Sequence, residues 1–404
     1  MDLRFSEEYE NFRAEVGAFL ADHWPPKGDE AKLEPVEQHA RFRKRAIAAG
    51  YLARSIPRKY GGSEQAPDVL KAVIIAEEFG KARAPRNTPG AGPGLLVPTL
   101  LEHGTEEQKR RYIEPTMTEE LKWCQGFSEP GAGSDLASIQ TKAELIGDEW
   151  VINGQKIWTS EAKQSDMIFM LCRTEPVAPK HAGISYLMVN MRQPGIDVRP
   201  LRQMNGDFEF SEVFFNDART SADNLVGQRG AGWIVSRSTL KHERTTVGSG
   251  PQGSVREFES LLRLVRDTVL DGRPALEDPR VRQRLVEIEG YVRSHEYSGY
   301  RQLTCDARGQ DPGPVVTMNK LVGSDIFKMI AELGLDLIDD YGLRAPSAVR
   351  APEAPRPDRR VNWVGGRINS IARTIGGGTS NTHRNVIGER GLGLPRDFSA
   401  QKSS

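Results

Sequence analysis

The sequence predicts an α+β multidomain chain with a helical N-terminal domain, a barrel-like middle antiparallel β-domain and a C-terminal helical bundle. Three observations lead to this order. Apolar residues recur at helical spacing near the N-terminus, alternate with polar ones in the middle, and return to helical spacing from about residue 231. We therefore expect domains at 1–118, 119–230 and 231–404.

The composition argues against several classes of protein. Lys+Arg and Asp+Glu number 55 each, so we expect no nucleic-acid partner. The three cysteines are far apart in the sequence, so we expect no disulfide framework and no metal site, which fits a reducing cytoplasm. No apolar stretch reaches about 18 residues and the first ten residues lack the apolar core of a signal peptide, so we expect no membrane span and a cytoplasmic location.

Helices are expected throughout the N-terminal domain. The first starts near Ser6 and ends at Trp24, which two prolines follow. Its apolar face consists of Phe5, Tyr9, Phe12, Val16 and Phe19. Further helices are expected over 35–49, 67–80, 95–103 and after Thr105, a residue type that caps helices.

The middle domain shows strand signals. Asn153-Gly154 separates two apolar runs and predicts a hairpin with a two-residue turn. Apolar runs at 167–172, 184–191 and 210–215 predict further strands, and Gly and Pro separate them. We expect a small antiparallel β-domain or barrel.

The C-terminal domain returns to helical spacing. Helices are expected over 255–269, 280–305 and 315–341. Residues 345–359 contain four prolines and predict no regular structure. A last helix is expected after Ser380.

The segment GFSEPGAGSDLAS at 126–138 is the strongest functional signal. Gly131 and Gly133 let the backbone approach a ligand and take φ > 0 at little steric cost. Backbone N–H groups there, together with the hydroxyls of Ser128 and Ser134, could cradle a phosphate. The alternative is a loop that only turns the chain.

This segment resembles the first signature of the acyl-CoA dehydrogenase family, an aromatic or aliphatic residue followed by Ser/Thr–Glu–Pro–x–x–Gly–Ser–Asp. Every position of that pattern matches. The resemblance implies that Phe127, Ser128, Gly133 and Ser134 lie against the flavin of FAD. It also implies that Ser134 lies beside the acyl-CoA thioester.

Two further segments extend the resemblance. Trp158-Thr159-Ser160 matches the family's Trp-x-Thr/Ser, which implies that Trp158 and Ser160 contact the isoalloxazine ring, with Thr159 adjacent. The alternative is an ordinary strand end. TIGGGTSNTHRNVIGERGLGLPR at 374–396 resembles the family's ending, which implies that Thr379 and Asn381 contact the ADP half of FAD. Its alternative is an ordinary capped helix.

The usual catalytic position departs from the family pattern. Many members place a catalytic Glu directly before Gly-Thr-Ser, where this chain has Gly377. Other members carry the base as Glu followed by Arg on an early helix of the C-terminal domain, and Glu243-Arg244 matches that pattern. We expect Glu243 to remove the α-proton, with its pKa raised by burial, and Arg244 to hold the substrate or orient Glu243. A solvated helix face is the alternative.

Two interface motifs of the family are missing. The family often has Arg-x-x-Phe-Gly after the first C-terminal helix, and here RDTVLDGRPALEDP at 266–279 keeps only Arg266, as a possible FAD phosphate contact. The second signature, a Gln followed by a Gly-Gly turn and an aromatic residue, is also absent. The resemblance therefore leaves open a homo- or hetero-oligomer, dimer or tetramer.

The function implied by the resemblance is FAD-dependent α,β-dehydrogenation of an acyl-CoA to the trans-2-enoyl-CoA, with electrons passing to an electron-transfer flavoprotein. The substrate would belong to fatty acid or steroid side-chain degradation. One alternative is a non-catalytic subunit that completes the FAD site of a partner chain. Another is an oxidase or monooxygenase of the same fold that uses oxygen.

Overall fold

The structure is a computed structural model that describes residues 6–86, 90–176, 178, 180–246, 251–343 and 361–395. Within these ranges it does not describe the side chains of residues 243–246, 306–307, 341 and 361–362. The chain forms two compact units. The first comprises Met1–Pro200 and Phe210–Leu240, and the second comprises Leu201–Glu209 and Lys241–Ser404.

The first unit begins with five helices, as the sequence predicts. Trp24 ends the first of them in an extended conformation, because the prolines that follow cannot continue a helix. The last begins with a capping box, in which Thr105 Oγ1 accepts from the Gln108 N–H and Gln108 Oε1 accepts from the Thr105 N–H, both at 3.1 Å. The helices are α1 Glu7–His23, α2 Pro35–Ala48, α3 Val69–Ala82, α4 Val97–His103 and α5 Glu106–Met117.

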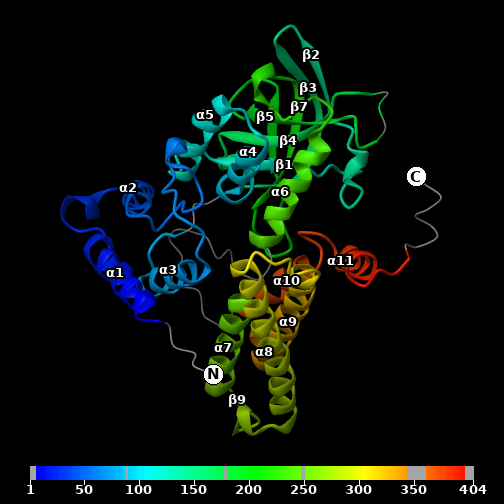
Figure 1. Ribbon diagram of the computed structural model, residues 1–404. Helices are drawn as coiled ribbons and strands as arrows, with labels where there is room; N and C mark the ends of the chain where they lie inside the picture. Colours follow the sequence, from blue (N-terminus) through cyan, green and yellow to red (C-terminus); the bar gives the residue numbers. More distant parts are fainter. Residues whose placement is uncertain are drawn as a thin grey trace. The chain divides into compact units, whose positions relative to one another are not determined.

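One sheet of eight described strands completes the first unit (Figure 1). The strands are β1 Trp123–Gly126, β2 Lys142–Ile146, β3 Glu149–Ser160, β4 Met167–Arg173, β5 Ile184–Asn190, β6 Ile196–Pro200, β7 Phe210–Ser221 and β8 Leu225–Val226. Their order is β6-β7-β3-β2-β4-β5-β8, with β1 beside β4. β1 and β2 pair with β4 in parallel, and the other pairs are antiparallel.

The predicted helical–β–helical fold class is confirmed, but the sheet is not a closed barrel. Among the described residues no pairing joins β6 to β8, so the sheet stays open. Both faces of the sheet are buried. One carries Phe169, Tyr186 and Met188 and packs with Leu96, just before α4, and Leu100 of α4. The other packs Trp150 and Ile152 against residues of β4, β5 and β7.

The hairpin predicted at Asn153-Gly154 is wrong. β3 runs through both residues, and the turn between β2 and β3 lies at Gly147-Asp148 instead. Gly154 has a φ of +151°, and a Cβ there would lie 2.6 Å from Thr141 Oγ1. The Asn153 side chain accepts from the Asp217 N–H on β7 at 2.9 Å. Asn153-Gly154 therefore forms no turn and lies opposite a β-bulge of β7, where two residues between Phe215 and Ala218 face one residue of β3.

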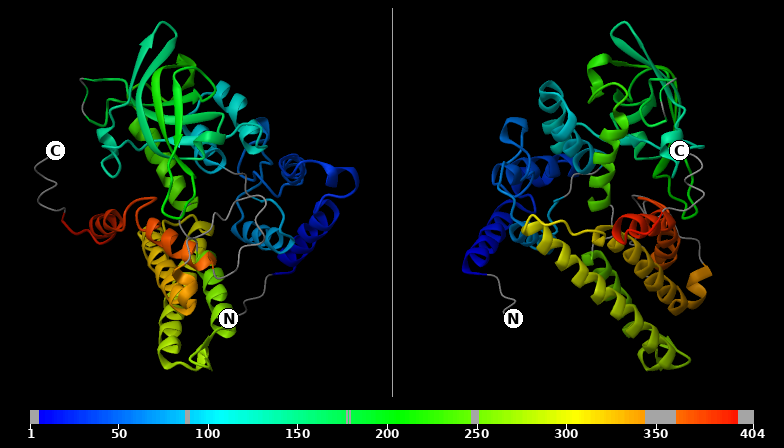
Figure 2. Two further views of the ribbon diagram at one scale, coloured as in Figure 1. Left: turned by 180° about the vertical axis from the view of Figure 1, so that it is seen from behind. Right: turned by 45° about the vertical axis from the view of Figure 1, so that its right-hand side comes forward.

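The second unit is mainly helical (Figure 2). α6 Gly232–Thr246 begins in the first unit, and the helices that follow are α7 Pro251–Asp267, α8 Pro279–Ala307, α9 Val315–Leu337, α10 Val361–Ala372 and α11 Ser380–Val386. α7, α8 and α9 share one core that includes Leu261, Val292 and Ile330. Gly334 lets α10 approach α9 closely, since a Cβ there would lie 2.1 Å from the Trp363 ring.

One helix and one hairpin of this unit are not expected from the sequence. α10 was not predicted, and neither was a small hairpin of β9 Val269–Leu270 and β10 Arg273–Pro274. The hairpin turns at Asp271-Gly272, where both residues have positive φ, as this turn type requires. The proline-rich stretch 345–359 lies outside the described residues. None of the described helices is long and apolar enough to cross a membrane.

Candidate functional site

The Gly-Ser loop leaves β1 beside the centre of the sheet. It starts where Gly126 packs so closely that a Cβ would lie 2.7 Å from Ile168 Cδ1. Glu129 and Ala132 exchange two backbone hydrogen bonds of 3.0 Å and form a tight turn. Gly131 and Gly133 are exposed, with no atom within 4 Å of a built Cβ. Neither has positive φ, so their open surroundings, not a left-handed backbone, would let a ligand approach.

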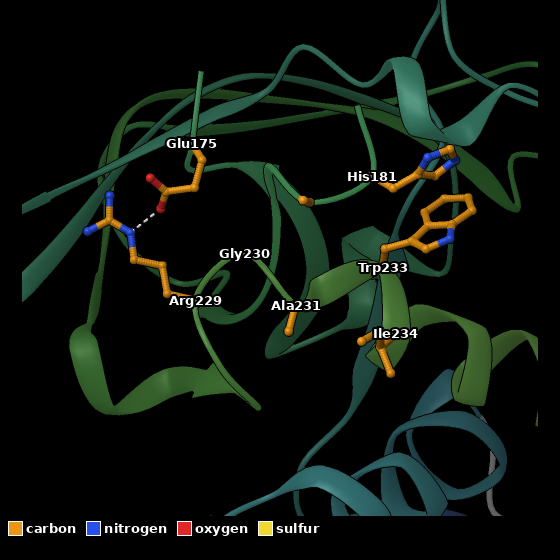
Figure 3. Close-up of a pocket in the computed structure, with 8 residues that line it drawn as sticks. Glu175, His181, Arg229, Gly230, Ala231, Trp233 and Ile234 are labelled. Atoms are coloured by element: carbon orange, nitrogen blue, oxygen red, sulfur yellow. Dashed lines mark hydrogen bonds and ion pairs between the residues drawn. The ribbon is translucent and has the colours of Figure 1, made fainter. Parts of the chain in front are cut away.

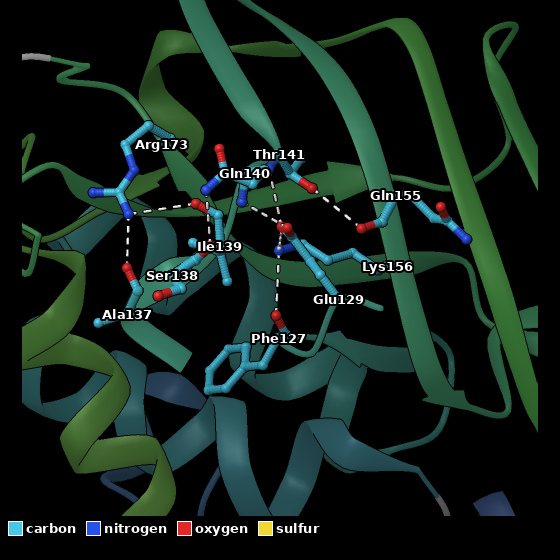
Figure 4. Close-up of polar contacts among 10 residues, drawn as sticks. All are labelled: Phe127, Glu129, Ala137, Ser138, Ile139, Gln140, Thr141, Gln155, Lys156 and Arg173. Atoms are coloured by element: carbon cyan, nitrogen blue, oxygen red, sulfur yellow. Dashed lines mark hydrogen bonds and ion pairs between the residues drawn. The ribbon is translucent and has the colours of Figure 1, made fainter. Parts of the chain in front are cut away.

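A buried ion pair anchors this loop to the sheet (Figure 4). Lys156 Nζ on β3 lies 2.7 Å from Glu129 Oε1 and also donates to the Phe127 carbonyl at 3.2 Å. The Glu129 carboxylate accepts the backbone N–H groups of Gln140 at 2.6 Å and Thr141 at 3.0 Å. Burial alone would raise the Glu129 pKa, but the Lys156 ammonium and the donated hydrogen bonds outweigh it and hold that pKa below its usual value.

The predicted residues of the loop have different environments. Phe127 is buried, with edge contacts to Phe169 and Tyr186 at ring distances of 6.0 and 5.9 Å, so it belongs to the core. Ser128 is half-buried, and its carbonyl accepts from the Ile157 N–H. Ser134 is exposed on the loop surface.

A strained aromatic residue follows the buried lysine. Trp158 has a φ of +60°, which is rare for a bulky residue, and 58% of its side chain is exposed. Its ring meets Phe210 edge-on at 5.9 Å. The conformation arises at a register shift of β3 against β7 between Lys156 and Thr159. This bulge turns a flat aromatic surface toward solvent.

Thr159 and Ser160 complete the predicted triplet. Thr159 is fully buried, and its Oγ1 has no hydrogen-bond partner in the described part of the chain. A buried hydroxyl without a partner costs free energy unless a bound group pairs with it. Ser160 is exposed and pairs with Phe210 across the strands. β3 thus carries three consecutive residues of different character: the exposed ring of Trp158, the buried hydroxyl of Thr159 and the exposed Ser160.

A hollow of about 470 Å³ lies elsewhere in the first unit (Figure 3). The start of α6 lines it with Trp233 and Ile234, and the β4–β5 connection lines it with His181. The His181 and Trp233 rings meet at 4.6 Å. At the other end of the hollow, the Arg229 side chain forms an ion pair with Glu175. The hollow therefore combines an aromatic wall with a polar end.

The predicted C-terminal residues surround a glycine turn in the second unit. Gly377 and Gly378 have φ values of +67° and +96°. Thr379 caps α11, and its Oγ1 accepts from the Thr382 N–H at 3.2 Å. Asn381 is exposed and accepts from Arg384 at 3.3 Å. The hydroxyl of Thr379 is therefore already used within the chain, whereas Asn381 remains accessible.

The remaining predicted residues are less constrained. Arg266 is exposed in the last turn of α7 and forms no hydrogen bond or ion pair with another described side chain. Glu243 and Arg244 lie on α6, but their side chains are not among those that the structure describes. No group of metal-ligating side chains occurs in the described residues.

Comparison with known proteins gives the family. Three family models match in order: acyl-CoA dehydrogenase N-terminal domain at 6–120, middle domain at 124–218 and C-terminal domain at 230–392. The chain belongs to the acyl-CoA dehydrogenase family. It is therefore an oxidoreductase that acts on acyl-CoA, in a family that depends on FAD.

Full-length relatives support this assignment. Acyl-CoA dehydrogenase IpdE1 of Mycobacterium tuberculosis is 38% identical, over 97% of this chain and 99% of that protein. A solved structure named the Tcur3481-Tcur3483 steroid ACAD has a TM-score of 0.77 and 27% identity, covering 98% of this chain and 100% of that chain. The ChsE4-ChsE5 complex from Mycobacterium tuberculosis has a TM-score of 0.76 and 26% identity, with the same coverage.

Sequence reasoning missed the residues that hold the site together. Lys156 belongs to none of the sequence motifs described above. It is nevertheless fully buried and pairs with Glu129 of the signature segment. The available signal was a lysine on the strand face that also carries Trp150, Ile152 and Trp158, since a lysine on such a face is buried only when it is paired. The alternation around it indicated an inward-facing position.

Proposed function

We propose that this acyl-CoA dehydrogenase converts an acyl-CoA thioester to the trans-2-enoyl-CoA and uses FAD as its cofactor. The observation that carries the proposal is the strained, exposed Trp158, with the exposed Ser160 two residues further along β3. Backbone strain costs free energy and persists mainly where a ligand uses it. An exposed indole suits a flat heteroaromatic ring.

The residues present fit FAD in both units. In the first unit, Trp158 and Ser160 would contact the isoalloxazine ring, and Ser128, Gly133 and Ser134 would line the approach that the open loop surface leaves. Phe127 would support the loop from the core. In the second unit, Thr379 and Asn381 would hold the ADP half, and Arg266 would contact a phosphate.

The chemistry requires a base because the α-proton of a thioester is only weakly acidic. Glu243 would remove this proton, and Arg244 would hold the substrate or orient Glu243. Hydrogen bonds from Ser134 or nearby backbone N–H groups to the thioester carbonyl would stabilise the negative charge that develops there. Bound FAD would supply the acceptor for the hydride that leaves the β-carbon.

We also propose bulky acyl groups, such as steroid side chains, as the substrate class. The support is that a solved relative with 27% identity is named a steroid ACAD. An electron-transfer flavoprotein is the proposed electron acceptor, as in the family at large.

A second function is favoured by one observation. Gly377 occupies the position where many family members carry the base, and glycine cannot accept a proton. The chain would then be a non-catalytic subunit that completes the FAD site of a partner chain. Solved relatives that are complexes of two chains are compatible with that role.

One experiment tests the proposed reaction. Wild type and Glu243→Gln are purified with FAD, and their flavin spectra are recorded anaerobically during addition of a panel of acyl-CoAs, including steroid-derived ones. We expect wild type to bleach and Glu243→Gln to retain FAD but bleach at least 1,000-fold more slowly, because loss of a positioned base costs a large part of the rate. Glu287→Gln, at an exposed position on α8, is the matched control.

Two outcomes of this bleaching experiment would contradict the proposed reaction. Equal bleaching of wild type and Glu243→Gln would show that the base lies elsewhere. Wild type that binds FAD but bleaches with no acyl-CoA would favour the non-catalytic subunit.

A further inference from the structure

Lys320 is a buried lysine that the proposed mechanism does not use. It lies on α9 with 8% of its surface exposed. Its Nζ donates to the carbonyl of Gly378 at 2.7 Å and to the carbonyl of Arg373 at 3.0 Å. No carboxylate of the described residues lies within ion-pair distance of it. A buried ammonium that binds only carbonyls is costly, so its position calls for a physical explanation.

The same face of α9 contacts the segment that follows α10. Ser324, one turn after Lys320, also donates to the Arg373 carbonyl at 3.2 Å. Phe327, a further turn along, lies 4.0 Å beneath the Arg373 guanidinium. Three residues at helical spacing therefore hold the segment that links α10 to α11.

The end of α10 explains part of the stabilisation of the Lys320 charge. α10 ends at Ala372, and the last carbonyls of a helix lack partners within that helix. They also carry the negative end of the helix dipole, where a cation is favourable. The Lys320 ammonium meets both conditions at the Arg373 carbonyl.

The bond to Gly378 has a different consequence. A trans peptide bond is planar, so its N–H points away from its C=O. Because Lys320 draws the Gly378 carbonyl inward, the Thr379 N–H points the other way. His383 Nε2 lies 3.1 Å from the Gly377 carbonyl, which orients the Gly378 N–H in the same manner. No acceptor within the described chain takes either N–H.

We propose that Lys320 is a positioning residue for FAD: it holds the Gly377–Gly378 turn so that the N–H groups before α11 face the phosphates of the cofactor. The inference rests on the proposed function, because it concerns the same FAD site. Lys320 itself does not touch the cofactor. It acts through the Gly378 carbonyl, and its loss frees the peptide to rotate.

The test compares FAD affinity with the stability of the apoprotein. Wild type, Lys320→Met and Lys328→Met are stripped of flavin, titrated with FAD by fluorescence quenching, and melted without FAD. Met keeps the length and apolar stem of Lys but donates no hydrogen bond. Lys328 lies exposed on the same helix and serves as the matched control.

We expect the FAD dissociation constant of Lys320→Met to rise at least tenfold, while its apoprotein melts within a few degrees of wild type. Lys328→Met should match wild type in both measurements. An FAD affinity of Lys320→Met within threefold of wild type would overturn the inference and leave the proposed function intact. Failure of wild type to bind FAD both alone and in complex with a co-expressed acyl-CoA dehydrogenase chain would instead remove the proposed function.

Two further variants keep the inference testable. One is used if Lys320→Met does not fold, and the other shows whether a cationic donor at this position is what matters. If apo Lys320→Met does not fold, Ser324→Ala decides, because it leaves Lys320 in place and removes a hydroxyl that donates to the Lys320 carbonyl at 2.8 Å and to the Arg373 carbonyl at 3.2 Å. A two- to fivefold weaker FAD affinity supports the inference, and an unchanged one contradicts it. Lys320→Arg keeps a cationic donor at this position, and it should recover more than half of the lost affinity on a logarithmic scale.

Discussion

At the scale of single residues, the signature loop depends on charges that lie beneath it. The exposed members Gly133 and Ser134 have few contacts of their own. The buried Glu129 connects the loop to β3 through Lys156 and to the start of β2 through Gln140 and Thr141. The Glu of the signature is therefore a structural anchor, and the residues after it are free to meet a ligand.

Replacing Lys156 with Met should be strongly destabilising. The Glu129 carboxylate would remain buried without its counter-ion, which costs about 3–5 kcal/mol. The measurement is urea-induced unfolding at pH 7, followed by circular dichroism. Arg219→Met is the matched control, because it breaks a pair with Glu149 that is about half exposed and should cost less than about 1 kcal/mol.

The difference should also depend on pH. In wild type the Glu129 pKa is lower in the folded state than in the unfolded state, so its contribution is present above about pH 4.3 and is lost as the pH falls through the folded pKa. In Lys156→Met, burial without a counter-ion raises the folded pKa. The variant should therefore approach wild-type stability as the pH falls toward 4. A constant difference between pH 7 and pH 4 would contradict this role of the pair.

The local conformation of the Trp158-Thr159-Ser160 triplet could not be predicted from the sequence. The Trp158-Thr159-Ser160 triplet was recognised as a motif, but its positive φ and the unpartnered Thr159 hydroxyl were not foreseen. Both arise from a register shift against β7, which lies some 50 residues later in the sequence. Local residues do not specify such a shift.

At the scale of elements, periodicity predicted the long helices and the central strands well. α8, α9, β4 and β5 lie where the apolar patterns placed them, because each buries a continuous apolar face. The exceptions involve glycine. Asn153-Gly154 was predicted as a turn, but it lies within β3, opposite a bulge of β7 and close to Thr141. Asp271-Gly272 was not recognised, although it forms the turn of β9 and β10.

The glycine turn before α11 allows a test at this scale. Gly377→Ala should lower the free energy of unfolding by about 1–2 kcal/mol, because a φ of +67° is unfavourable for a residue with a Cβ. Gly376→Ala is the control, since its φ is not positive and a Cβ would meet its nearest atom at an ordinary 3.7 Å. Chemical denaturation of the two apoproteins checks this. Equal stability of both variants would show that the turn relaxes at no cost.

At the scale of the whole molecule, the chain matches its family from end to end but departs from it at the positions linked to assembly. The matched regions cover 6–392 with short gaps. Where the family often has the interface motif Arg-x-x-Phe-Gly, this chain has the β9–β10 hairpin, with Val269 65% exposed.

These departures lead to a prediction about assembly. We expect the chain expressed alone to carry clearly less than one FAD per chain, and co-expression with an acyl-CoA dehydrogenase chain encoded beside it to give a stable complex with a higher FAD content. The physical reason is that both interface motifs of the family are missing, so a second copy of this chain would supply fewer contacts to the FAD, and solved relatives include complexes of two chains. Light scattering after gel filtration, with flavin absorbance of the same peak, measures both quantities. One FAD per chain in a homo-oligomer of the chain alone would contradict the prediction, because the site would then be complete without a second kind of chain.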